Sequence, residues 1–225
     1  MSVLRPVLVQ TDNHNTDMLC YELEAWQNNH TLVAGTDEAG RGPLAGPVVS
    51  GAVIIDREAI HRLAEDTLEG LTDSKKLTEK KREHFFTILS EHPSIHTGVG
   101  ILNPADIDRM NILEASRQSM RDAIIDLNPA PDFILVDGLA VPDLPAPSNP
   151  IVKGDSKSLS IAAASIIAKV TRDRIMLEYA DQYPEYGFHR HKGYGTKAHL
   201  EALREHGPCP IHRRSFKPVR EQYLF

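Results

Sequence analysis

The sequence is poor in cysteine and contains no long apolar run. Its 225 residues include only two cysteines, Cys20 and Cys209, in unrelated contexts, so we expect neither a disulfide framework nor a cysteine-based zinc site. Nowhere do about 18 apolar residues follow one another, so we expect no membrane-spanning helix. The first residues lack the basic stretch and apolar run of a signal peptide. These absences predict a soluble, cytoplasmic protein with no membrane partner.

Acidic residues outnumber basic ones, which at first argues against a polyanionic partner. The formal net charge is -6, but the charge is unevenly distributed. Between positions 187 and 220, eight lysines and arginines stand against two glutamates. A basic C-terminal segment beside an acidic body suits a nucleic-acid enzyme with a metal site. A solvated charged face is the alternative explanation of the same pattern.

Apolar periodicity predicts an α/β fold. We expect strands over 31–36, 46–55, 95–102, 133–136 and 150–152, and helices over 79–89, 103–127, 160–178 and 197–205. Three strands with short links, followed by strand, helix, strand and helix, predict a mixed sheet of about five strands with helices on both faces. A length of 225 residues suits one large domain, or one domain with a modest appendage.

Four acidic side chains come at predicted strand ends or directly before a predicted helix. Asp37 and Glu38 follow the first strand, Asp137 follows the apolar run FILV, and Asp155 precedes a nearly all-apolar helix. Ligand sites of α/β sheets gather at strand ends. Adjacent strand residues point to opposite faces, so the first strand must end or twist here if Asp37 and Glu38 serve one site.

Each of these carboxylates also has a simpler explanation when it is taken alone. Asp137 could be a turn residue, Asp155 a helix cap and Glu38 an exposed charge. Taken together they would repel one another and raise each other's pKa values. A bound Mg²⁺ or Mn²⁺ ion removes that penalty, because hard cations prefer oxygen ligands. The four positions therefore predict a divalent-metal site.

Longer motifs resemble one family, bacterial ribonuclease HII. The motifs are GTDEAGRGPLAGPVV at 35–49, TDSKKL at 72–77, ILVDG at 134–138, KGDSKSLSIAAASIIAKVTRD at 153–173, HKGYGT at 191–196 and HRRSF at 212–216. The resemblance implies a ribonuclease H-like fold with a C-terminal helical appendage. We expect an N-terminal extension at 1–30 outside the core, a catalytic core at 31–180 and a basic, helical substrate-binding segment at 181–225. We expect no second large N-terminal domain of the kind that ribonuclease HIII carries.

The resemblance also implies an activity. A family member is an endoribonuclease that cuts the RNA strand of RNA–DNA hybrids and cuts 5′ to a single ribonucleotide embedded in duplex DNA. It implies two divalent ions, Mn²⁺ or Mg²⁺, held by Asp37, Glu38, Asp137 and Asp155. We expect Asp37 to bridge both ions, because it is central in its motif.

The substrate-reading positions of the family fall on two glycine-containing loops. Gly40, Arg41 and Gly42 form a short loop whose backbone can approach a sugar and read its 2′-hydroxyl; a plain turn is the alternative. Tyr194 lies between two glycines, which suits an exposed aromatic side chain that contacts the DNA junction. A buried core tyrosine is the alternative.

Other polar residues near these motifs are candidates for phosphate contact. They are Ser74, Lys75, Lys76, Lys153, Lys157, Lys169 and Arg172. For Lys169 and Arg172 a solvated helix surface is the alternative. Arg213 and Arg214 either bind the DNA backbone or pin the C-terminal segment to the body. We expect His189, His191 and His212 to have structural or phosphate-contact roles, because no carboxylate stands near them at metal-ligand spacing.

Three other functions compete with this interpretation. They are another nuclease or strand transferase of the same fold class, an inactive nucleic-acid-binding module and a small-molecule phosphatase. The two glycine loops argue against the first alternative. The four intact carboxylates argue against the second, and the basic segment argues against the third. We expect a monomer. The tail Gln222–Phe225 vaguely resembles peptides that dock on sliding clamps, but it is one residue short of their spacing, and we prefer packing of Leu224 and Phe225 on the body.

Overall fold

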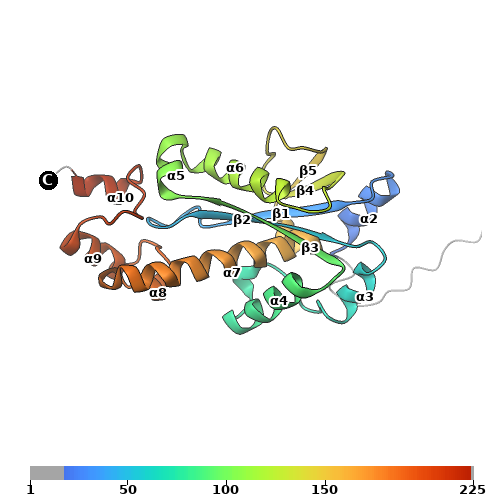
Figure 1. The fold of residues 1–225 in the computed structure, drawn as a ribbon, viewed down its shortest axis with the longest axis horizontal. Coiled ribbons are helices and arrows are strands. Elements are labelled where there is room, and N and C mark those ends of the chain that lie inside the picture. The colour runs from blue at the N-terminus through green and yellow to red at the C-terminus, as the bar shows by residue number, and fades with distance from the viewer. Residues whose placement is uncertain (1–17, 224–225) are drawn as a thin grey trace, which may run out of the picture.

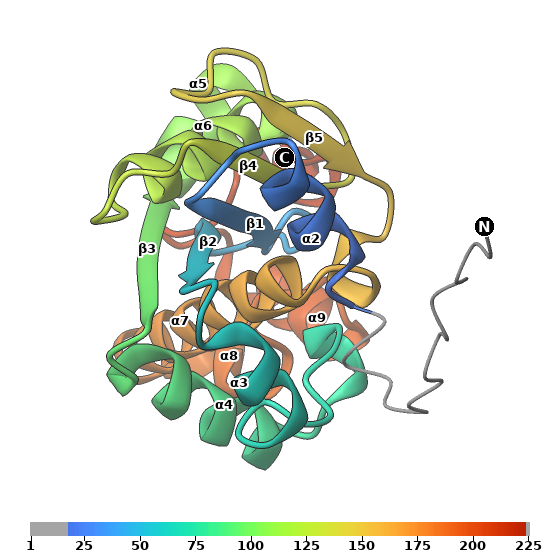
Figure 2. The same cartoon turned by 90° about the vertical axis from the view of Figure 1, so that its right-hand side faces the viewer.

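A mixed five-stranded sheet forms the centre of the computed structural model, which describes residues 18–223 (Figures 1 and 2). The strands are β1 (Val33–Ala39), β2 (Val48–Ile55), β3 (Ile95–Leu102), β4 (Phe133–Asp137) and β5 (Ser148–Ile151). Their order is β3-β2-β1-β4-β5. The β1–β2 and β2–β3 pairs are antiparallel, whereas β4 lies parallel to both β1 and β5. The predicted mixed sheet is confirmed.

Helices cover both faces of this sheet (Figure 2). The helices are α2 (Cys20–Gln27), α3 (Ile60–Glu65), α4 (Glu79–Glu91), α5 (Pro104–Met110), α6 (Ile112–Ile125), α7 (Leu159–Gln182), α8 (Phe188–His191), α9 (Lys197–His206) and α10 (Lys217–Arg220), with 3-10 turns η1 (Ser74–Lys76), η2 (Gly154–Ser156), η3 (Pro184–Tyr186) and η4 (Glu221–Tyr223). Helices α5 and α6 lie on one face and α7 on the other, with α3 and α4 outside α7. Helices α8, α9 and α10 gather at one end (Figure 1). No helix within residues 18–223 is long and apolar enough to cross a bilayer.

Helix α7 lies unusually close to the two central strands. A side chain at Gly35 of β1 would collide with the backbone of Ser160 and Ile161, and one at Gly51 of β2 with the carbonyl oxygen of Ala164. These two glycines therefore bring the start of α7 against the strands that carry the acidic motif. The apolar first half of α7 fills the main core on this face.

Strand β1 is longer than the sequence predicts. If Asp37 and Glu38 serve one site, we expected the strand to end or twist at Asp37; it does not end there, but continues through Ala39 in register with β2. Asp37 lies opposite Gly51, and Glu38 lies opposite Ser50. Because β2 supplies a continuous pairing partner, the ladder overrides the weak strand propensity of the acidic residues.

The long helix predicted over 103–127 is two helices. The break falls at Asn111, which has a φ of 75° and ends α5. Its side-chain oxygen then caps α6 by accepting hydrogen bonds from the backbone N–H groups of Leu113 at 2.9 Å and Glu114 at 3.1 Å. The cap re-aims α6 along the sheet.

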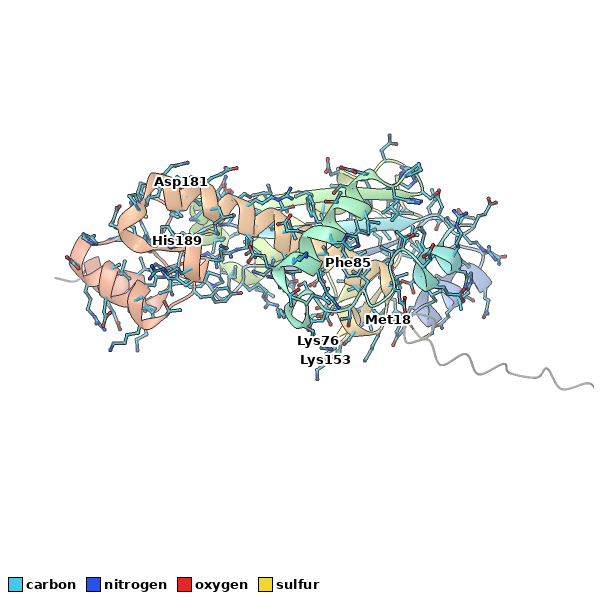
Figure 3. All side chains as sticks on the ribbon, turned by 90° about the horizontal axis from the view of Figure 1, so that it is seen from below. Met18, Lys76, Phe85, Lys153, Asp181 and His189 are labelled. Carbon is cyan, nitrogen blue, oxygen red and sulfur yellow. The ribbon has the colours of Figure 1, made fainter. Side chains whose placement is uncertain are left out.

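The N-terminal segment that precedes β1 is part of the core where the structure describes it. Met18 (labelled in Figure 3), Leu19 and Trp26 are buried in the main apolar cluster. The expectation that the extension at 1–30 packs outside the core is therefore wrong from residue 18 onward, because α2 supplies apolar side chains that cover the sheet. Residues 1–17 lie outside the described residues. The domain boundary expected at 180 stays a prediction, and α7 runs across it.

Candidate active site

A cleft of about 250 Å³ opens beside the end of β1. Eight of the predicted site residues line it, together with Ala39, Lys169 and Arg172: Asp37, Glu38, Gly40, Arg41, Gly42, Ser74, Lys75 and Tyr194. Asp137 instead borders a small neighbouring cleft, which it shares with Glu38 and Arg41. A larger hollow of about 550 Å³ near α3 contains none of the predicted residues. Burial, charge and chemistry therefore indicate that the candidate active site is the cleft of about 250 Å³ beside β1.

Two carboxylates come from consecutive positions of β1. Asp37 is only 6% exposed, and its Oδ1 accepts a hydrogen bond of 2.7 Å from the backbone N–H of Glu38. The carboxylate of Glu38 lies 3.3 Å from the Arg41 guanidinium, and Glu38 borders both clefts. Glu38 is partly buried, so its explanation as an exposed charge is wrong.

A backbone hydrogen bond links the other two acidic positions, Asp137 and the turn that carries Asp155. Asp137 ends β4, and its Oδ1 accepts a hydrogen bond of 2.6 Å from the backbone N–H of Gly154, in the turn that carries Asp155. The N-cap of α7 is Ser158, which accepts from the N–H of Ile161 at 3.2 Å. Asp155 is therefore not the cap of this helix, and that simpler explanation is wrong.

Electrostatics tie the four carboxylates together. Burial raises the pKa of Asp37 well above its usual value, and the charges of Glu38, Asp137 and Asp155 raise it further. Burial also raises the pKa of Glu38, although Arg41 opposes the shift. For Asp155, burial raises the pKa first, and neighbouring acidic residues, including Asp137, add to it. The cluster is one of mutual repulsion, which a cation relieves.

The donor set fits a hard divalent cation, because it offers carboxylate oxygens and no sulfur or nitrogen. Within residues 18–223, no three histidine, cysteine, aspartate or glutamate side chains form a ready-made metal-binding group. Backbone N–H groups hold one oxygen each of Asp37 and Asp137. The set therefore fits the ion in chemistry and charge, while its side chains remain in contact with protein donors.

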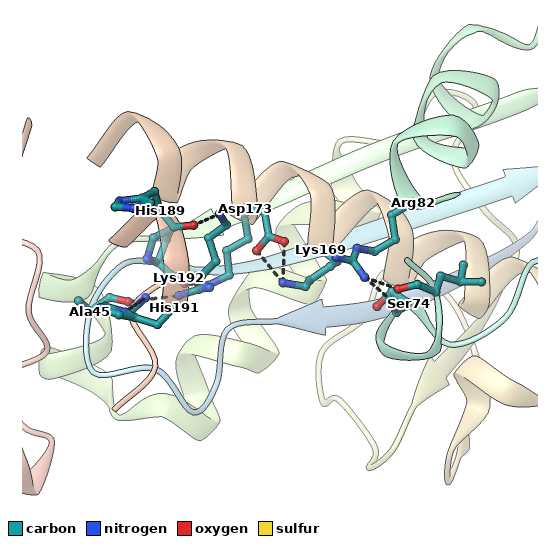
Figure 4. A network of polar contacts seen from close by, with 12 residues as sticks. Ala45, Ser74, Arg82, Lys169, Asp173, His189, His191 and Lys192 are labelled. Carbon is teal, nitrogen blue, oxygen red and sulfur yellow. Dashed lines mark hydrogen bonds and ion pairs between the residues drawn. The ribbon is translucent and has the colours of Figure 1, made fainter. Parts of the chain in front are cut away.

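The turn that carries Ser74 and Lys75 is held from two sides. The N–H of Ser74 donates to the Ser165 hydroxyl of α7 at 3.3 Å, and Arg82 of α4 donates to the Ser74 carbonyl at 3.1 Å (Figure 4). Burial lowers the pKa of Lys75, but the charges of Asp37 and other acidic groups outweigh it and the pKa is raised. Lys75 is therefore a fixed positive charge at the edge of the cleft.

Two buried arginines hold the loop between β1 and β2. Arg172 of α7 donates to the carbonyls of Pro47 at 2.9 Å and Ala45 at 3.2 Å. Arg213 donates to four carbonyls: Gly40 at 2.5 Å, Arg41 at 3.0 Å, Gly46 at 2.9 Å and Pro47 at 3.1 Å. Burial lowers the pKa of Arg172 to about 10; burial, then the charge of Arg172, lowers the pKa of Arg213 to about 9.

The burial of Arg213 and Arg172 decides between the roles that the sequence left open for them. Arg213 has no exposed surface, so it pins the loop and does not bind DNA. Arg172 is 1% exposed, so the solvated-surface explanation is wrong for it. Lys169, one turn earlier on α7, forms an ion pair of 2.6 Å with Asp173 (Figure 4). Gly40 adopts a φ of 97°, a region that favours glycine, and Arg172 fills the space where a side chain would stand.

Tyr194 is an exposed aromatic residue on the rim of the cleft. It is 45% exposed, and the Arg172 guanidinium lies 6.0 Å from its ring centroid. A Cβ at Gly42 would stand 3.7 Å from the ring, so the two predicted reading loops face each other. The explanation of Tyr194 as a core tyrosine is wrong.

Sequence reasoning missed His199, which is completely buried under the Tyr194 loop. Its Nδ1 lies 2.9 Å from the Tyr194 carbonyl oxygen. The available signal was periodicity, since His199 precedes the buried Leu203 by one helical turn. A histidine at such a position suggests a partnered side chain of the core.

Comparison with known proteins identifies the family. The sequence profile described as Ribonuclease HII matches residues 34–219. This chain belongs to the ribonuclease HII family. Ribonuclease HII of Acetivibrio thermocellus is 52% identical over 204 residues, which cover 91% of this chain and 77% of that protein. Ribonuclease HII of Chlamydia trachomatis serovar D is 52% identical over 201 residues, 89% of each chain.

Solved structures agree with the ribonuclease HII assignment. Ribonuclease H2 from Pyrococcus horikoshii superposes with a TM-score of 0.71 at 33% identity, covering 86% of this chain and 97% of that one. Ribonuclease HII of Archaeoglobus fulgidus, solved in complex with PCNA, gives 0.68 at 27% identity, with 83% and 95% covered. Bst-RNase HIII in complex with Mn²⁺ gives 0.63 at 20% identity, with 86% and 70% covered, which shows the fold alone.

The family confirms the predicted ribonuclease H-like fold and the predicted enzyme class. The chain is a ribonuclease H, a divalent-metal-dependent endonuclease that acts on RNA–DNA substrates.

Proposed function

We propose that this ribonuclease H cuts the RNA strand of RNA–DNA hybrids and also cuts 5′ to single ribonucleotides embedded in duplex DNA, using two divalent ions. One observation carries the proposal: the acidic pair of β1, the Gly40–Gly42 loop and the exposed Tyr194 line a single cleft. Such a cleft offers both the charge for phosphodiester hydrolysis and two surfaces for recognising one sugar.

Four carboxylates would hold the ions. Divalent ions at this site, Mn²⁺ or Mg²⁺, would acidify the attacking water and offset the charge on the leaving 3′ oxygen. Asp37 would be a ligand of both, since the charges of all three other carboxylates act on it. We assign Glu38 and Asp137 to one ion and Asp155 to the other. The N–H groups that already bind Asp37 and Asp137 would keep one oxygen of each in place.

The loops would read the sugar. The backbone of Gly40, Arg41 and Gly42 can contact a 2′-hydroxyl, which is both donor and acceptor and distinguishes RNA from DNA. Arg213 holds the carbonyls of Gly40 and Arg41, and Arg172 holds that of Pro47 farther along the same β1–β2 connection, so protein donors would fix this backbone before substrate arrives. Tyr194 would pack against the nucleotide 3′ to the ribonucleotide.

Positive charge around the cleft would bind the substrate backbone. Ser74 and Lys75 stand on a turn held by α4 and α7, and they suit contact with a phosphate. The basic segment beyond α7 adds exposed cations at the end of the molecule where His189 lies in Figure 3, whereas Lys76, the neighbour of Lys75, lies nearer its middle.

Three duplexes of one sequence test the proposal. They are an RNA–DNA hybrid, a DNA duplex with one ribonucleotide and an all-DNA duplex, each with Mn²⁺, with Mg²⁺ and with a chelator. We expect cleavage of the first two only with metal, and a single cut 5′ to the lone ribonucleotide. Cleavage of the hybrid alone would overturn the single-ribonucleotide proposal, and cleavage of all-DNA duplex would overturn recognition of the 2′-hydroxyl.

We propose that the chain acts as a monomer in the cytoplasm. The Archaeoglobus relative was solved with PCNA, a reason to test clamp binding here. In this chain Leu224 and Phe225 lie outside the described residues. A pull-down with purified bacterial clamp, comparing the full chain with one that lacks residues 222–225, decides: unchanged capture would end the hypothesis of a clamp-binding tail.

A further inference from the structure

Three histidines surround the backbone of the Tyr194 loop. His199 Nδ1 lies 2.9 Å from the Tyr194 carbonyl oxygen, and its Nε2 lies 3.0 Å from Nε2 of His212. His191 Nδ1 accepts a hydrogen bond of 3.2 Å from the N–H of Gly193, the residue before Tyr194. The rings of His191 and His199 stack with their centroids 4.5 Å apart. The Lys192–Gly193 and Tyr194–Gly195 peptide groups are thus held by imidazoles.

The proton positions of the His199–His212 pair follow from one backbone donor. The N–H of Cys209 points at His212 Nδ1 at 3.0 Å, and a backbone N–H can only donate. His212 must therefore carry its proton on Nε2, where it donates to His199 Nε2. His199 then carries its proton on Nδ1 and donates it to the Tyr194 carbonyl.

The same reasoning fixes the third ring. The N–H of Gly193 donates to His191 Nδ1, so the proton of His191 stands on Nε2, which lies 2.9 Å from the Tyr186 carbonyl oxygen. All three rings are then neutral, and each has both nitrogens engaged. A second proton on His199 would set two N–H groups against each other across the 3.0 Å contact with His212, and a second proton on His212 would face the Cys209 N–H at 3.0 Å.

Burial supports the neutral state. His199 is 0% exposed and His212 is 2% exposed. Burial lowers the pKa of each to about 4, and the imidazole neighbours add to the shift. The Cys209 thiol also faces His212 Nδ1 at 3.1 Å, and burial raises its pKa to about 11, so it stays protonated. The titratable neighbours of the pair therefore add no counter-charge that would favour an imidazolium.

The pair is joined to the other reading loop through its chain neighbours. His212 forms a β-bridge with Ala45, and the N–H of Arg213 donates to the Leu44 carbonyl at 2.8 Å. The N–H of Leu44 in turn donates to the Gly193 carbonyl at 2.8 Å. The segment around His212 thus contacts the loop that starts at Gly40 as well as the loop that carries Tyr194.

We propose that His199 and His212 are positioning residues: a proton-ordered imidazole pair that fixes the Tyr194 carbonyl, and with it the angle at which the Tyr194 ring meets the substrate. The inference rests on the proposed role of Tyr194 in reading a single ribonucleotide. It adds the device that holds that side chain in place. The pair touches neither substrate nor metal ligand, so it acts through the loop.

The first test is spectroscopic and uses the full wild-type chain. Long-range ¹⁵N–¹H correlation of the imidazoles shows which nitrogen carries the proton. We expect the Nδ1–H form for His199 and the Nε2–H form for His212 and His191. His199 and His212 should both stay neutral at about pH 5.5, below the ordinary pKa of an imidazole. The opposite tautomers, or a charged ring in the pair at that pH, would overturn the proposal.

The second test separates position from stability. His199→Phe keeps a ring but removes the donor to the Tyr194 carbonyl, whereas His199→Asn keeps a donor near the place of Nδ1. Thr196 N–H also donates to this carbonyl at 2.8 Å, so the loop is displaced but keeps one bond. We expect His199→Phe to lower kcat/KM on the single-ribonucleotide duplex about 3- to 10-fold, with less than about twofold on the hybrid.

Matched variants complete the test. His199→Asn should recover activity to within about twofold of wild type, and His206→Asn, an exposed change on the same helix, should alter neither substrate. Equal losses on both substrates, or no recovery by asparagine, would overturn the positioning role. Tyr194→Ala is measured in parallel. If it loses equal activity on both substrates, the proposed role of Tyr194 fails. If Tyr194→Ala loses more on the single-ribonucleotide duplex and His199→Phe does not, this inference alone fails.

Discussion

Around Asp37 buried carboxylates face one another, whereas around Arg213 a buried cation faces backbone carbonyls. The pKa of Asp37 is raised, because burial and then the charges of Glu38 and Asp137 disfavour its ionised form. Arg213 meets the same burial with four carbonyl acceptors within 3.1 Å. The carboxylates around Asp37 therefore repel one another, whereas the buried charge of Arg213 is stabilised by carbonyl acceptors of the protein itself.

The difference separates two tasks within one cleft. Carbonyl acceptors belong to the fold itself, so the arginine and histidine region can hold its loops without any added ion. Carboxylates that repel one another gain most from a divalent cation, so the β1 region is suited to recruit one. Metal binding is thus assigned to carboxylates that repel one another, and loop positioning to buried groups whose polar partners the fold supplies.

Removing the central carboxylate should have the largest effect. Asp37→Asn keeps the shape of the side chain but removes a negative oxygen ligand. We expect hybrid cleavage to fall by at least about 100-fold while duplex binding survives. Single-turnover cleavage with a filter-binding measurement checks both, and Asp181→Asn, an exposed change on α7, is the control. Near wild-type cleavage in saturating Mn²⁺ would mean that Asp37 is not a shared ligand.

Removing the exposed aromatic ring should have a smaller and selective effect. Losing a stacking contact of ~1–3 kcal/mol should lower kcat/KM of Tyr194→Ala by roughly 5- to 150-fold on a single ribonucleotide in DNA. The loss should be smaller on a long hybrid, which offers many other sites. Leu177→Ala removes a side chain of similar exposure, 42% against 45%, and serves as control. Equal losses on both substrates would count against junction reading.

The sequence predicted those parts of the molecule that depend on short patterns. Apolar runs located all five strands, and the prediction for β3 matches its bounds of Ile95–Leu102. The acidic positions were found because they follow apolar strands or directly precede a buried helix, and α/β sheets place ligand sites at strand ends. Glycines on both sides of Tyr194 indicated exposure, and the structure confirms it.

Features that depend on distant contacts were not predictable. Arg213 meets the carbonyl of Gly40 across 173 positions of sequence, and no local pattern distinguishes it from the exposed Arg214. His199 and His212 form their pair only after α9 folds back. The break at Asn111 was missed because the helix start at Asn103-Pro104 and the stripe that begins at Ile112 together predict one helix, whereas one capping side chain redirects the chain between them.

The arginine contacts should make a measurable contribution to stability. Arg213→Lys keeps the charge, but one ammonium cannot replace a planar fork that reaches four carbonyls. We expect the free energy of unfolding to fall by about 2–3 kcal/mol. Urea unfolding measures it, with Arg214→Lys, the exposed neighbour, expected to lie within about 0.5 kcal/mol of wild type. Equal effects of both changes would contradict the asymmetry between the two residues.

The two regions should also respond to pH in opposite directions when metal is absent. The pKa of Asp37 is raised from 3.8, so above that value the folded chain holds more protons than the unfolded chain, and stability falls as pH rises. The pKa values of His199 and His212 drop from 6.5 to about 4, so in this interval the unfolded chain holds more protons and stability falls as pH falls.

Variants separate these opposing slopes in Tm scans between about pH 5 and 8 with chelator present. Asp37→Asn removes the buried carboxylate whose ionisation destabilises the fold. Its Tm should therefore exceed that of wild type, and the difference should grow by about 2–4 °C as pH rises. His199→Phe removes one histidine term, so its deficit should shrink as pH falls. Added Mn²⁺ should stabilise wild type and leave Asp37→Asn nearly unchanged, which reverses their order. Parallel pH curves for the three proteins would show that neither region carries the buried charge assigned to it.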